Sequence, residues 1–212
     1  MKISDNITYA EAIHSQTAKR KGIDNTPNPT QVENMKLLAE KVFEPLRKWV
    51  GGPIKVNSFF RSPELNTAIG GVASSQHCKG QAIDIDDVYG YKTNAEMYHW
   101  VKENLNFDQM IWEFGTDMNP NWVHISYVSE EDNRNRCLKA YKDDMGRTKY
   151  KTNAEMYAWV KENLNFDQMI WEFGTDMNPN WVHISYVSEE DNRNRCLKAY
   201  KDEYNKTKYK TI

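Results

Sequence analysis

The chain has 212 residues, of which 39% are apolar and 27% are charged, and its formal net charge at pH 7 is −2. This length accommodates one or two domains, and the apolar content is sufficient for a packed core. The near-neutral charge argues against nucleic acid as a partner, because phosphate binding requires a basic patch. A membrane is not expected as a partner either, since no apolar run approaches the roughly 18 residues of a spanning helix.

The segment 28–53 predicts a long helix that contributes to the core. Asn28 and Pro29 are residues typical of a helix N-terminus, and apolar residues then recur at helical spacing. We expect Pro45 to close this pattern early, because proline removes a backbone donor and clashes with the preceding turn. The run Gly51-Gly52-Pro53 breaks the helix in any case.

Four short segments alternate between apolar and polar side chains, as strands do. They are residues 54–59, 81–85, 109–114 and 122–127, with an amphipathic helix expected at 94–105. We therefore predict an α+β fold, in which helices pack on a small antiparallel sheet.

Three residues on or near these strands are candidate metal ligands: His77, Asp84 and His124. Two imidazoles and a carboxylate hold Zn²⁺ and leave a coordination position open, which metal-assisted hydrolysis requires. Each residue alone also has an ordinary explanation, as a loop residue, a salt-bridge partner or a buried strand histidine. Their order, spacing and flanking residues together favour the zinc site.

The flanking residues extend this pattern over roughly Ile7 to Tyr127. The segments that carry it are, in chain order, Ser58–Asn66, Gly70–Val72, Ser75–Asp86, Phe107–Glu113 and Trp122–Tyr127. This ordered set resembles the M15 zinc peptidases, in the branch of D-Ala-D-Ala carboxypeptidases and phage endolysins. The resemblance implies a hedgehog/D-Ala-D-Ala peptidase-like fold with the zinc site on its sheet. It also implies a zinc-dependent peptidase that hydrolyses peptide bonds of peptidoglycan stem peptides.

Glu113 is the candidate general base, because a carboxylate beside a metal can take a proton from water and pass it to the leaving amine. Several family members place an acid three residues before the last histidine, where this chain has Asn121. By resemblance, Arg61 binds the substrate or polarises its carbonyl; the alternative is a surface ion pair. The resemblance also assigns Ser75 and Gln76 to contacts with the substrate or the ligands.

A near-identical internal repeat is the second main feature of the chain. Tyr91–Asp143 recurs as Tyr150–Asp202, and the only difference is an alanine, Ala158, in place of His99. Such identity exceeds what a shared fold requires, since surface positions drift freely. The expected parts are a peptidase domain at 1–143 and, at 150–212, a copy of 91–149.

Because His77 and Asp84 occur once, one chain can assemble at most one complete site. Either His124 or its copy His183, accompanied by Glu172, is chemically able to complete it. We expect His124, because the shorter loop from Asp84 costs about 0.8 kcal/mol less entropy to close. The other copy keeps an apolar face that needs burial, so we expect a homodimer or a swapped oligomer formed through the duplicated half.

Two other functions stay open at this stage. The runner-up is a catalytically inactive module that keeps the zinc fold and uses the duplicated half for assembly; a nonfunctional recombinant is the third possibility. The first residues turn polar at once and show no signal peptide. We therefore expect a cytoplasmic protein that is released on lysis or associated with a virion.

Overall fold

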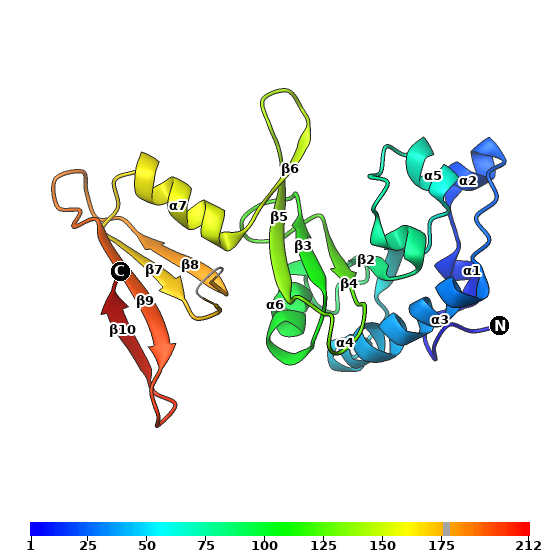
Figure 1. The fold of residues 1–212 in the computed structure, drawn as a ribbon, viewed down its shortest axis with the longest axis horizontal. Coiled ribbons are helices and arrows are strands. Elements are labelled where there is room, and N and C mark those ends of the chain that lie inside the picture. The colour runs from blue at the N-terminus through cyan, green and yellow to red at the C-terminus, as the bar shows by residue number, and fades with distance from the viewer. Residues whose placement is uncertain (176–178) are drawn as a thin grey trace. The chain divides into compact units, whose positions relative to one another are not determined.

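A computed structural model describes residues 1–175 and 179–212 of the chain (Figure 1). These residues form two compact units, Met1–Arg136 and Cys137–Ile212. Both units combine helices with β-strands, and the predicted α+β class is confirmed.

The first unit begins with several short helices and ends with the strands that carry the candidate ligands. Its elements are α1 (Tyr9–Ala12), α2 (Gln16–Lys21), α3 (Pro29–Leu38), the π-helix η1 (Ala39–Phe43), α4 (Glu44–Val50), β1 (Lys55–Ser58), α5 (Pro63–Ala68), the 3₁₀-helix η2 (Gln76–Lys79), β2 (Ala82–Asp86), α6 (Asn94–Asn104), β3 (Gln109–Glu113) and β4 (Trp122–Ser126).

These four strands are antiparallel and lie in the order β1-β2-β4-β3. All four agree with the segments predicted from alternation. In β2 and β4, the residues Ile83, Ile85, Val123 and Ile125 are almost fully buried. Because side chains alternate along a strand, the intervening residues Asp84 and His124 project to the opposite face of the sheet.

The prediction that the long helix ends early, at Pro45, is wrong. The π-helix η1 leads directly into α4, where Pro45 lies in the first turn. A proline is tolerated there because the turn before it is of π type: Glu44 N–H donates to the Ala39 carbonyl, so the regular i→i−4 ladder that proline breaks is already interrupted. The helix instead ends at Gly51, whose φ of 74° provides the left-handed cap. Its core-facing side chains are fully buried: Met35, Leu38, Val42 and Leu46.

The second unit contains the last two strands of the first copy of the duplicated sequence and the helix and strands of the second copy. Its elements are β5 (Arg136–Lys142), β6 (Thr148–Lys151), α7 (Asn153–Asn163), β7 (Gln168–Glu172), β8 (Trp181–Ser185), β9 (Arg195–Lys201) and β10 (Thr207–Thr211). β5 and β6 form an antiparallel pair. The other four strands form a sheet in the order β10-β9-β7-β8, in which β7 is parallel to β9 and antiparallel to β8.

Helix α7 contributes to a small core of this unit. The buried residues of that core are Tyr157, Val160, Phe166, Met169 and Cys196. The cluster contains side chains from α7, β7 and β9, so the duplicated sequence has its own hydrophobic core here.

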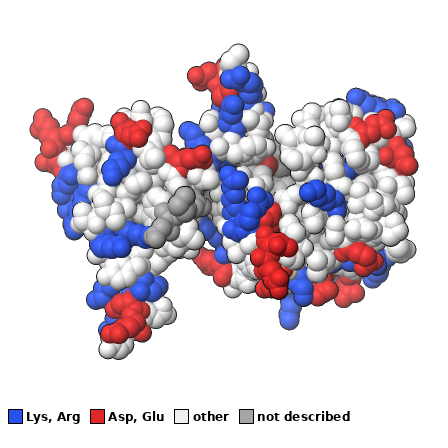
Figure 2. All heavy atoms as spheres, in the orientation of Figure 1, with Lys and Arg blue, Asp and Glu red and all other residues white. Residues whose placement is uncertain are grey.

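Both signs of charge occur on each unit in the face shown in Figure 2, in keeping with the net charge of −2. Among residues 1–175 and 179–212, no helix has both the length and the apolar character needed to cross a membrane.

Candidate metal centre

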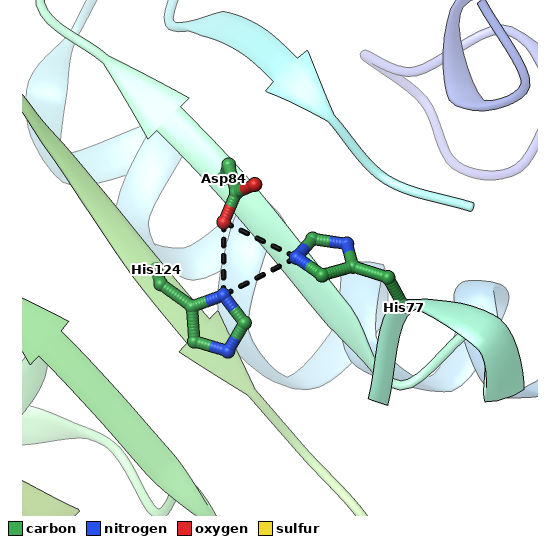
Figure 3. A group of neighbouring side chains, drawn as sticks. All are labelled: His77, Asp84 and His124. Carbon is green, nitrogen blue, oxygen red and sulfur yellow. Dashed lines mark hydrogen bonds and ion pairs between the residues drawn. The ribbon is translucent and has the colours of Figure 1, made fainter. Parts of the chain in front are cut away.

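The three predicted ligands come from three neighbouring elements of the first unit. His77 lies in η2, Asp84 in the middle of β2 and His124 in the middle of β4. Asp84 is directly opposite His124 in the antiparallel ladder, so their side chains leave the same face of the sheet at adjacent positions. Figure 3 shows the imidazole of His77 pointing toward this pair.

The donor atoms of these side chains form a small triangle. His77 Nε2 lies 3.2 Å from Asp84 Oδ1 and 3.3 Å from His124 Nδ1, and the third side, from His124 Nδ1 to Asp84 Oδ1, is 2.8 Å. Donors bound tetrahedrally at about 2.0–2.1 Å from zinc are roughly 3.3 Å apart. Two sides of the triangle match this spacing, and the third is a hydrogen-bond distance. The residues therefore fit a zinc ion in donor chemistry and in two of the three donor–donor distances.

A backbone carbonyl orients the first ligand. His77 Nδ1 lies 2.6 Å from the carbonyl oxygen of Phe59, so we assign the proton to Nδ1, which donates to that oxygen. The lone pair is then on Nε2, the nitrogen that faces the other two ligands. A hydrogen bond of this kind selects the tautomer and the ring orientation that a metal requires.

Arg61 is adjacent to the ligands rather than paired with a surface carboxylate. Its Nη2 donates to Asp84 Oδ2 and lies 3.2 Å from His77 Nε2, and its Nε donates to Ser58 Oγ at 2.8 Å. The two oxygens of Asp84 are thereby divided between two tasks: Oδ2 accepts from arginine and Oδ1 faces the imidazoles. This arrangement restricts the rotation of the carboxylate and directs one oxygen at the candidate metal position.

Two of the candidate ligands, Asp84 and His77, are kept in the protonation states that bind metal. Burial would raise the pKa of Asp84, but the neighbouring His77 and the hydrogen bond with His124 outweigh it and hold this pKa well below its usual value. Burial lowers the pKa of His77, and the attraction of Asp84 opposes that shift only in part. The carboxylate is therefore charged and the imidazole of His77 neutral near pH 7, as metal binding requires.

The loop that carries His77 is anchored by an aspartate that the sequence did not single out. Gln76 Nε2 donates to Asp108 Oδ2 at 2.8 Å, and Arg134 donates to both oxygens of Asp108 at 2.6 and 2.7 Å. The structure thus gives Gln76 a contact that holds the ligand loop, while its contact with substrate stays a prediction. Ser75 precedes η2 and accepts a backbone hydrogen bond from Cys78.

Asp108→Asn is expected to weaken zinc binding about 10- to 100-fold, the range typical of residues that support metal ligands. The amide cannot accept from both Arg134 and Gln76 as a carboxylate does, so the loop beside His77 loses its anchor. Competition titration against a chromophoric chelator measures the change in affinity.

The matched control is Asp167→Asn, because Asp167 binds Arg193 at the same 2.6 and 2.7 Å in the second unit. That substitution is expected to leave zinc affinity unchanged. Equal effects of the two substitutions on zinc affinity would contradict the anchoring role of Asp108.

Glu113 is buried at the end of β3, on the strand next to His124. Ile111 is directly opposite His124 and Glu113 opposite Trp122, so Glu113 is a diagonal neighbour of the histidine on the same face. Such neighbours have Cα atoms about 7–8 Å apart. Glu113 thus borders the three ligands without belonging to their cluster.

The duplicated hairpin keeps the same register in the second unit. Ile170 is opposite His183, and Glu172 is opposite Trp181. Burial raises the pKa of Glu172, and the neighbouring His183 opposes this shift in part. Among the residues that the structure describes, however, the metal-type cluster contains His124 and not His183.

The fold and the site together define an α+β protein with a candidate metal centre on its sheet. The family model described as Peptidase M15 matches residues 5–126, which is more than half of the chain, and the chain therefore belongs to the M15 peptidase family. This confirms the resemblance found in the motifs, and the matched range contains all three candidate ligands. No curated protein matches this chain.

Proposed function

We propose that the protein is a zinc-dependent peptidase that hydrolyses peptide bonds in the stem peptides of peptidoglycan, as a D-Ala-D-Ala carboxypeptidase or an endolysin-type endopeptidase. The observation that carries the proposal is the triangle of His77, Asp84 and His124 donors in a chain of the M15 family. We propose in addition that the first unit has the hedgehog/D-Ala-D-Ala peptidase-like fold.

Zinc held by these three residues supplies Lewis-acid polarisation of a carbonyl and lowers the pKa of water in the site. The carboxylate of Glu113 then takes a proton from the attacking water and delivers it to the amine that leaves. Its burial and its diagonal position to His124 support this role. A carboxylate suits a general base, because it accepts a proton from water and can release it again to a leaving group.

Arg61 is proposed to hold the substrate. A cleft of about 690 Å³ reaches Arg61 from the surface, and its lining includes His14, Gln16, Asn57 and Ser58. The contacts of Arg61 with Asp84 and Ser58 use Nη2 and Nε, and we propose that Nη1 donates to a substrate oxygen. A guanidinium suits this task, because it is permanently charged and donates in pairs to carboxylates. Ser75 is proposed to assist in positioning the substrate.

Mass spectrometry of peptidoglycan digested with the purified protein tests this function. We expect either loss of terminal D-alanine, the mark of a carboxypeptidase, or separation of cross-linked peptides, the mark of an endopeptidase. A chelator is expected to abolish the new products and added Zn²⁺ to restore them. An unchanged muropeptide profile from protein that contains one zinc per chain would instead support the inactive binding or structural module.

A further inference from the structure

The duplication places one strand sequence, Trp-Val-His-Ile-Ser, in two different surroundings. In the first unit this strand is β4, which pairs with β3 on one side and with β2 on the other. In the second unit it is β8, and β7 is its one strand partner within the described residues. The consequence is visible at the isoleucine, which is 1% exposed as Ile125 and 48% exposed as Ile184.

The open edge of β8 lacks the charged side chains that keep edge strands apart. β8 contains no Lys, Arg, Asp or Glu, whereas β10, at the opposite edge of the same sheet, carries Lys208 and Lys210. Charged side chains, lysine above all, are the usual protection of an exposed edge. The uncharged edge of β8 is therefore a surface on which a further strand can pair.

Other exposed apolar side chains of the second unit have covered counterparts in the first. Trp159 of α7 is largely exposed, while the equivalent Trp100 of α6 stacks on Trp49 with ring centroids 5.2 Å apart. In the first unit, then, residues that precede the repeat cover the surface beside α6 as well as the edge of β4.

The chain has two copies of the strand Trp-Val-His-Ile-Ser but only one β2, and this shortage limits what can pair with β8. Residues 1–90, which contain β2, occur once per chain, and β2 pairs with β4. Exchange of residues 1–90 between chains would cover one β8 only by uncovering one β4, so the number of open edges stays the same. The other edge strands within the described residues, β1, β6 and β10, each carry lysine. In a solution of this chain alone, the uncharged strand edge that remains for pairing with β8 is therefore the β8 of a second chain.

We propose that the protein forms a twofold dimer through antiparallel pairing of β8 with β8 of a second copy, centred on His183. This register pairs all five residues of the strand: Trp181 with the partner's Ser185, Val182 with the partner's Ile184, and His183 with the partner's His183. The β-branched pair reproduces the pairs of Ile83 with Ile125 and of Ile85 with Val123 in the first unit. Each four-stranded sheet continues into the other, and the interface is isologous.

Sedimentation velocity of the full chain tests the dimer. Wild-type protein is expected to have twice the mass of the 24.9 kDa chain, and Ile184→Lys to raise the dimer dissociation constant at least about 100-fold, because the symmetry places two buried charges in the interface. The matched control is Tyr209→Lys, an exposed residue on the β10 edge, which is expected to leave the dimer intact. A monomeric wild type, or an Ile184→Lys dimer as stable as the wild type, would overturn the proposal. Far-UV circular dichroism verifies that each variant is folded.

Disulfide trapping tests the register independently of dimer stability. Residues directly opposite in an antiparallel pair have Cα atoms about 4.5–5.5 Å apart, within the range of a disulfide. His183→Cys is expected to cross-link to its own copy under diamide oxidation, as seen on a non-reducing gel. Ser185→Cys, which lies opposite the partner's Trp181, is not expected to do so. Cross-linking of Ser185→Cys as readily as His183→Cys, or of neither, would overturn the register. The unmodified chain, with its native Cys78, Cys137 and Cys196, is the background control.

Neither experiment measures peptide hydrolysis, so the dimer and the peptidase function can fail separately.

Discussion

His124→Ala is expected to abolish stoichiometric zinc binding, whereas His183→Ala leaves one zinc per chain. The two histidines stand in identical sequence, but only His124 is opposite Asp84 and within 3.3 Å of His77 Nε2. Removal of a direct ligand should weaken affinity by more than the roughly 10- to 100-fold typical of supporting residues. Elemental analysis of folded, dialysed protein and chelator competition measure the stoichiometry and the affinity.

The duplication makes this comparison unusually well matched, because the same chemical change is introduced twice in one chain. Peptidoglycan hydrolysis should follow zinc content, with activity lost in His124→Ala and kept in His183→Ala. Loss of zinc from His183→Ala with retention in His124→Ala would show that the second copy completes the site. Retention of zinc in both variants would show that neither histidine is required.

Glu113→Gln should reduce the rate of peptide hydrolysis by about 10²- to 10⁴-fold, the usual contribution of a general base. The amide is nearly isosteric with the carboxylate but cannot accept a proton, and Glu113 does not belong to the ligand cluster. Zinc stoichiometry is therefore expected to be unchanged. Rates of product formation from a defined stem peptide, measured at equal zinc content, give the effect.

Glu172→Gln is the control for this substitution, since Glu172 has the same position relative to Trp181 and Ile170 as Glu113 has relative to Trp122 and Ile111. It is expected to have wild-type activity. If Glu113→Gln hydrolyses the peptide at the wild-type rate, another group is the base. If it loses zinc, Glu113 supports the metal instead.

Much of the candidate site could be predicted from the sequence, because its main determinants are local. The alternation of apolar and polar residues in 81–85 and 122–127 predicts which side chains share a face of each strand. When the two strands pair, Asp84 and His124 therefore lie on the same face of the sheet. The spacing of these residues and the motifs around them also indicated the M15 family, to which the chain belongs.

Features that depend on distant partners could not be predicted in this way. Asp108 is 32 residues from Gln76 and 26 from Arg134, and its buried position was its only available signal, visible in the fold alone. Pro45 misled the prediction for a related reason. A local rule ends the helix at proline, but the π-helix before α4 already interrupts the regular hydrogen-bond ladder at Pro45, so the helix continues.

The sequence by itself determined the types of ligand, the faces of the strands on which they lie, and the fact that residues 1–90 can complete only one site. The loop length favoured the first copy of the repeat by about 0.8 kcal/mol, and only the tertiary structure shows that β2 pairs with that copy. Two identical segments have identical local preferences, so no reading of those residues can distinguish them. The buried His124 and the exposed His183 differ only because one strand pairs with β2 and the other does not.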